Sequence, residues 1–91
     1  MNTAPETIAA FTGWLASQGF ASERPGVFGY WPDDDCQIVV VIATDDSLVG
    51  WTIKGPDGES IGAIECIRSS KKDWLTIAQA NIARILRGFR L

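Results

Sequence analysis

The sequence predicts a single α+β domain over residues 1–91, with the element order α-β-β-β-β-α. Three observations carry this prediction: an N-terminal segment with helical spacing, four short strand-like segments, and a C-terminal apolar stripe. The strand-like segments are separated by links of three to five residues, which are too short for a crossover. We therefore expect a four-stranded antiparallel meander with both helices packed on one face, in two layers.

The first helix is predicted over residues 4–18. A capping box with a proline near the first helical position occupies residues 3–6, and Gly19 supplies the stop signal. Three apolar residues recur at helical spacing inside this segment: Ile8, Phe11 and Leu15. Residues 20–26 are expected to form a connection to the first strand.

Four segments are expected to form the strands: Val27–Trp31, Gln37–Thr44, Leu48–Lys54 and Ser60–Ile67. Each is bounded by Pro, Gly, Asp or Ser residues that favour turns. The second strand is apolar on both of its alternating faces, whereas an antiparallel sheet usually leaves one face polar and wet. Either neighbouring Trp and Tyr side chains shield the open face, or a second subunit or partner protein covers it. The second interpretation predicts a homodimer or a partner at this face.

The last helix is expected to start near Ser69 or Ser70. Its apolar stripe consists of Leu75, Ala78, Ile82, Ile85, Leu86 and Phe89. Arg84 and Arg87 lie on the opposite side of the same helix, where late positive charge also suits the helix dipole.

Charge is divided unevenly along the chain. Residues 1–65 hold ten acidic and two basic residues, a balance of −8, and residues 66–91 hold one acidic and six basic residues, a balance of +5. The two balances sum to the net charge of −3. Such asymmetry indicates electrostatic interaction with a partner.

No catalytic or metal-binding motif is present. The absence of His removes the commonest general base and most zinc sites. Cys36 and Cys66 are expected to be reduced, buried thiols. The run Asp33–Asp35 lacks the Gly and Glu spacing of a calcium loop, so it predicts a solvated turn. We expect no enzyme activity, no cofactor and no metal.

The chain is expected to be cytoplasmic and independent of membranes. Its N-terminus lacks the basic start and apolar run of a signal peptide. The longest aliphatic run, Ile38–Ala43, holds six residues, against roughly 20 for a membrane-spanning helix.

The leading functional hypothesis is a small acidic protein-interaction module. Alternate turns of a meander emerge at one end of the sheet, so the first and third turns should pool their acidic residues beside an aromatic anchor. The predicted partner-binding residues are Trp31, Asp33, Asp34, Asp35, Asp57 and Glu59. The chain is similar in size and chemistry to phage and mobile-element inhibitors of the anti-CRISPR or anti-restriction type. Its architecture also resembles that of secretion chaperones, which suggests an adaptor or chaperone role.

The alternative hypothesis is nucleic-acid binding through the basic C-terminal segment. The anion-binding candidates are Lys71, Lys72, Arg84 and Arg87. The segment from Ser69 to Lys72 resembles the start of the last helix in double-stranded-RNA-binding domains. We favour this hypothesis less, because the acidic body would repel a polyanion.

Overall fold

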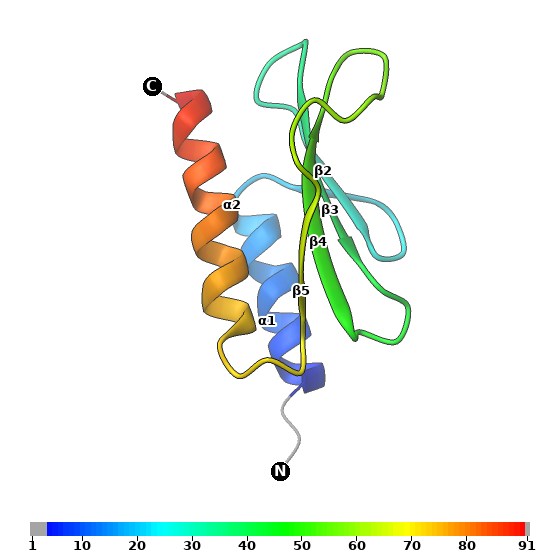
Figure 1. The fold of residues 1–91 in the computed structure, drawn as a ribbon, viewed down its shortest axis with the longest axis vertical. Helices are drawn as coiled ribbons and strands as arrows, with labels where there is room; N and C mark the ends of the chain where they lie inside the picture. The colour runs from blue at the N-terminus through cyan, green and yellow to red at the C-terminus, as the bar shows by residue number, and fades with distance from the viewer. Residues whose placement is uncertain (1–3, 91) are drawn as a thin grey trace.

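The computed structural model describes residues 4–90 and contains two helices and five strands. In chain order these are α1 (Ala4–Ser17), β1 (Ala21–Arg24), β2 (Val27–Tyr30), β3 (Gln37–Ile42), β4 (Leu48–Lys54), β5 (Glu65–Arg68) and α2 (Trp74–Arg90). The strands form one antiparallel sheet in the order β1-β2-β3-β4-β5. Both helices lie on one face of this sheet, and the other face is bare (Figure 1). The predicted α+β meander with helices on one face is confirmed.

The expected number of four strands is wrong, because the connection predicted over residues 20–26 contains β1. All four residues of β1 are exposed, so the segment lacks the alternating pattern by which a strand is recognised. Pairing with β2 across a tight turn makes it a strand, and Gly26 adopts a left-handed φ of 77° in that turn. A register shift between Ser22 and Arg24 interrupts the pairing.

The first helix ends as predicted, within one residue. Gly19 has a φ of 102°, the left-handed conformation that glycine adopts most readily. The Phe20 N–H donates to the Leu15 carbonyl at 3.0 Å and the Gly19 N–H donates to the Ala16 carbonyl at 3.1 Å. This is a Schellman motif, and its apolar pair, Leu15 and Phe20, is buried in the core. The predicted capping residue, Thr3, lies outside the described residues.

The last predicted strand, residues 60–67, is wrong in its first half. Ser60 makes an isolated bridge to Lys54, and β5 begins only at Glu65, opposite Trp51. Between these two pairs, β4 advances by three residues, from Lys54 to Trp51, while the facing segment advances by five, from Ser60 to Glu65. The extra residues include Gly62, which has no side chain to pack, and glycine in a strand often marks such a bulge.

The last helix begins at Trp74, later than the expected start at Ser69 or Ser70. Ser69 does not cap it, because its N–H donates to the Ser47 carbonyl at 3.0 Å and its hydroxyl donates to the Asp46 carbonyl. The chain then turns, and the Trp74 N–H donates to the Lys71 carbonyl at 3.1 Å. The link between β5 and α2 is therefore tied to the β3–β4 turn.

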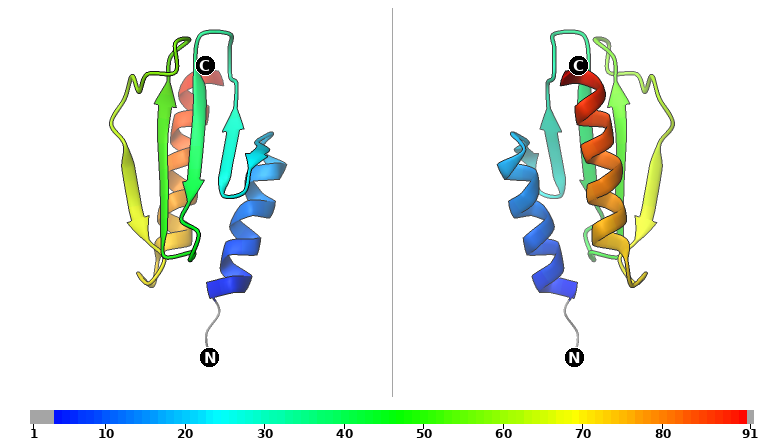
Figure 2. Two further views of the ribbon diagram at one scale, coloured as in Figure 1. Left: turned by 90° about the vertical axis from the view of Figure 1, so that its right-hand side faces the viewer. Right: turned by 90° about the vertical axis from the view of Figure 1, so that its left-hand side faces the viewer.

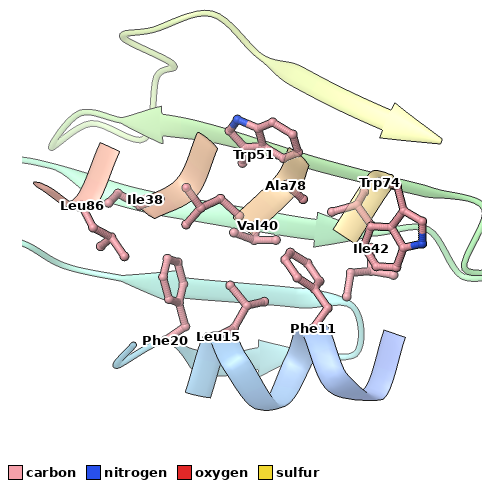
Figure 3. Close-up of a cluster of buried hydrophobic side chains, with 12 residues drawn as sticks. Phe11, Leu15, Phe20, Ile38, Val40, Ile42, Trp51, Trp74, Ala78 and Leu86 are labelled. Atoms are coloured by element: carbon pink, nitrogen blue, oxygen red, sulfur yellow. The ribbon is translucent and has the colours of Figure 1, made fainter. Parts of the chain in front are cut away.

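The core lies between the sheet and the two helices (Figure 3). Its buried members are Phe11, Leu15, Phe20, Ile38, Val40, Ile42, Val49, Trp51, Trp74, Ala78, Ile82 and Leu86. The helices meet where the rings of Phe11 and Trp74 contact edge to face, with centroids 5.5 Å apart and planes at 77°. The other members of the predicted stripe on α2, Leu75, Ile85 and Phe89, are half-buried against this core.

Candidate protein-interaction surface

Two loops that carry acidic residues emerge at the same end of the sheet, as the meander predicts. They are the β2–β3 loop, residues 31–36, and the β4–β5 loop, residues 55–64, and we call them together the acidic end (Figures 1 and 2). The five predicted carboxylate residues of these loops, Asp33, Asp34, Asp35, Asp57 and Glu59, are all exposed.

Asp33 has a structural role in its loop. Its Oδ1 accepts hydrogen bonds from the backbone N–H groups of Asp35 at 2.8 Å and of Cys36 at 2.9 Å. An aspartate that bonds to the backbone two residues ahead builds a turn from its own side chain. Within the described residues Asp34 has no such bond, so its carboxylate is available to a partner.

The second loop is held by its backbone. The Gly55 N–H donates to the Glu59 carbonyl at 2.8 Å, and the Gly58 N–H donates back to the Gly55 carbonyl at 3.0 Å. Gly58 has a φ of 83° and nothing lies within 4 Å of the position of a Cβ there. Asp57 therefore stands in an exposed, hydrogen-bonded turn.

The acidic end also carries an exposed aromatic side chain. Trp31 follows directly after β2 and is 53% exposed, whereas Trp74 is 4% exposed and belongs to the core. An exposed Trp beside charged loops is the residue type most often found at the centre of binding interfaces.

The two thiols differ from the expectation that both are buried. Cys66 is exposed and Cys36 is half-buried, and both are free. Partial burial, and then the negative charges of Asp33 and Asp35, raise the pKa of the Cys36 thiol.

The β3–β4 turn, which contains Asp45 and Asp46, is also acidic and lies at the opposite end of the sheet. Asp45 Oδ1 accepts hydrogen bonds from the Ser47 hydroxyl at 2.5 Å and from the Ser47 N–H at 3.0 Å. These bonds stabilise the ionised carboxylate and lower the pKa of Asp45. Because Asp46 bonds to Ser69 through its carbonyl, this turn lies close to the chain that leads to Lys71.

The four basic candidates do not form one patch. Lys71 and Lys72 precede α2, whereas Arg84 and Arg87 lie in its second half and are exposed. Ten residues of helix, at about 1.5 Å each, place Arg84 roughly 15 Å beyond the start of α2. The Arg84 guanidinium donates to Asn81 Oδ1 at 2.7 Å on the same helix.

The open face of the sheet carries a small apolar area. Val41 is 46% exposed, while Val39 on the same face is 5% exposed. Their cross-strand neighbours are Gly29 and Gly50. The side chains of Glu23 and Gln37 lie over Gly29, where the Gln37 amide donates to Glu23 Oε2 at 2.6 Å. Tyr30 and Trp51 do not shield this face, because both pack on the helix side.

In the part of the chain that the structure describes, some surface hollows are lined mainly by apolar side chains. A groove of about 290 Å³ lies between α1 and the ends of β2 and β3, lined by residues that include Ile8, Phe28 and Ile42. A smaller hollow of about 170 Å³ lies under the bulge before β5.

Among residues 4–90, no three His, Cys, Asp or Glu side chains are arranged to hold a metal ion. Within the same part of the chain, neither helix has the length and apolar character needed to cross a bilayer. Comparisons with protein-family models, curated proteins and solved structures found no match to this chain.

Proposed function

We propose that this chain is a non-enzymatic protein-interaction module that binds a partner with a basic surface through its acidic end. One observation carries the proposal: the two acidic loops emerge together, beside an exposed Trp31. Exposed carboxylates gathered in one place repel one another, and a basic partner would relieve that repulsion. An inhibitor or an adaptor that covers a basic surface fits this chemistry.

The absence of His in the sequence supports the non-enzymatic part of the proposal, since the commonest general acid and base is missing. The open face offers a second contact area for the same partner, around Val41 and Leu48, which is 38% exposed. Its apolar character would add affinity, while the acidic end would steer the approach.

The test begins with recovery of the partner by affinity capture from the cells that make the protein, followed by binding measurements with single charge reversals. Asp34→Lys and Asp57→Lys are the informative variants, because Asp33 holds its own loop and its replacement would also disturb the backbone. Asp73→Lys is the control at the opposite end, since Asp73 is exposed and precedes α2. Because Asp73 occupies the N-cap position of α2, circular dichroism must first show that this variant is folded.

The proposal expects the two variants at the acidic end to weaken binding at low salt by more than about 1 kcal/mol each, and Asp73→Lys to have little effect. Losses below that value would leave the acidic end a solubilising surface, because peripheral charges contribute about that little. Tight binding of DNA or RNA at about 0.15 M salt, lost on Lys71→Glu, would support the nucleic-acid alternative instead.

A further inference from the structure

We propose that two copies of this chain associate through β5, edge to edge, so that their sheets join in one antiparallel sheet with Cys66 opposite its own copy. The inference goes beyond the proposed function, since it concerns an outer strand of the sheet and a second copy of this chain, not a basic partner. It starts from β5, an outer strand of the sheet that pairs with β4 on one side only. A strand at an edge presents unpaired N–H and C=O groups that can bind another strand.

The hydrogen bonds of the neighbouring residues show which groups of β5 point outward. The Ser69 N–H donates to the Ser47 carbonyl, one step beyond the Leu48–Arg68 pair. Because inward and outward groups alternate along an antiparallel strand, Ile67 and Glu65 also bond to β4. The backbone groups of Cys66 and Arg68 therefore face away from the sheet. The Ile64 carbonyl faces the same way, since it is opposed to the Glu65 N–H across a trans peptide.

Of these outward groups, the Arg68 carbonyl already accepts the Lys71 N–H at 3.0 Å. The groups left for a partner strand are the N–H and C=O of Cys66, the N–H of Arg68 and the C=O of Ile64. A two-fold axis beside Cys66 pairs all of them. The two Cys66 residues exchange N–H···O=C bonds, and each Arg68 N–H meets the Ile64 carbonyl of the other copy.

Side chains favour the same register. A two-fold axis at Glu65 or Arg68 would place like charges directly opposite each other, which is unfavourable in a sheet. The axis at Cys66 sets Arg68 opposite Ile64 of the second copy. Ile64 is 72% exposed, and the aliphatic part of an arginine can cover such a side chain.

The other edge of the sheet is protected against the same association. A register shift interrupts β1 between Ser22 and Arg24, charged residues occupy it, and Pro25 follows directly. Bulges, charges and proline are the devices by which proteins block edge pairing. β5 also carries two charged residues, Glu65 and Arg68, but it contains no proline and its register to β4 is regular.

The first test measures association by sedimentation velocity under reducing conditions, up to about 1 mM protein, because a short edge forms a small interface of the weak class. We expect a reversible monomer–dimer equilibrium. Cys66→Pro removes an outward N–H without breaking a bond to β4, so it should give a folded monomer, and Cys66→Ala should remain a dimer. A natural chain that stays monomeric over this range overturns the proposal.

The second test examines the register by substitution of an exposed residue, which should leave the packing of the core unchanged. Ile64→Glu places a carboxylate opposite Arg68 of the other copy, and Ile64→Lys places a like charge there. With two such pairs in the dimer, we expect the Glu variant to associate roughly fivefold more tightly than the Lys variant at low salt, or more. Equal affinities, or the reverse order, contradict the register.

The third test uses the thiol itself. Opposed residues in a hydrogen-bonded pair have Cα atoms about 5.5 Å apart, within the range that a disulfide can bridge. Mild oxidation should therefore cross-link the Cys36→Ser variant into a covalent dimer through Cys66. The Cys66→Ser variant, which keeps Cys36, should stay uncrosslinked. Cross-linking through Cys36 alone would overturn the assignment of the interface to β5.

Discussion

Trp74 and Trp31 should respond in opposite ways to truncation. Trp74 is 4% exposed and packs edge to face on Phe11, where α1 meets α2, while Trp31 is 53% exposed beside the β2–β3 loop. Replacement of a buried Trp by Ala costs about 3–5 kcal/mol, whereas exposed substitutions usually stay within about 0.5 kcal/mol. We therefore expect Trp74→Ala to be strongly destabilising and Trp31→Ala to be nearly neutral for folding.

The measurement is urea unfolding followed by far-ultraviolet circular dichroism. With a denaturant slope of about 1.5 kcal/mol per molar urea, Trp74→Ala should lower the midpoint by roughly 2–3 M and Trp31→Ala by less than about 0.5 M. If Trp74→Ala leaves too little folded protein to measure, Trp74→Phe can replace it. This variant keeps an aromatic ring and should lower the midpoint by a smaller amount. Equal losses for Trp31→Ala and Trp74→Ala would refute the burial on which this prediction depends.

Three further predictions concern single positions. Gly26→Ala should destabilise the fold by about 2 kcal/mol or more, because its Cβ would lie 2.6 Å from the Ile42 carbonyl oxygen and its φ is 77°. Gly58→Ala has open space around it and should cost only the backbone strain, about 1–2 kcal/mol. Hydrogen bonds from Ser47 lower the pKa of Asp45 in the folded state. The ionised carboxylate therefore stabilises the folded state at pH values above its unfolded pKa of about 3.9, and this stabilisation is lost as the pH falls through the lower folded pKa. Asp45→Asn should therefore reduce the thermal midpoint at pH 7 and converge with the natural chain in acid; a constant difference across pH would contradict the assignment. In dilute solution at pH 8, Cys66 should react faster with a thiol reagent than Cys36, whose pKa is raised, as single Cys→Ser variants would reveal.

The sequence predicts those parts of the fold in which one local signal decides the structure. Gly19 ends α1, the short links make every strand pair antiparallel, and the stripe from Leu75 to Phe89 places α2 on the core. The sequence misses β1 because pairing with β2, and not its own composition, makes that segment a strand. The start of α2 is also missed, because Ser69 is hydrogen-bonded to the β3–β4 turn instead of capping the helix. This tertiary contact cannot be predicted from the local sequence.

The candidate site follows the same division. Chain order alone places the two acidic loops at one end of the sheet, and the structure agrees. Which carboxylate is free and which one builds the loop depends on side-chain geometry, so the structural role of Asp33 appears only there. The exposure of Cys66 likewise depends on β5 being an outer strand, which requires knowledge of the strand order.

The fold also changes what the uneven charge along the chain means. The chain that leads into α2 is bonded to the Asp45–Asp46 turn, and α2 runs from there toward the acidic end, so the basic segment extends from one acidic region toward the other (Figure 1). In chain order, Lys71 and Lys72 come just before α2, and Arg84 and Arg87 lie in its second half. At a Debye length of about 8 Å, opposite charges so distributed partly cancel each other's field at a distance. We therefore expect a polyanion to meet no extended positive face, and a partner that contacts the two loops directly to meet their exposed carboxylates.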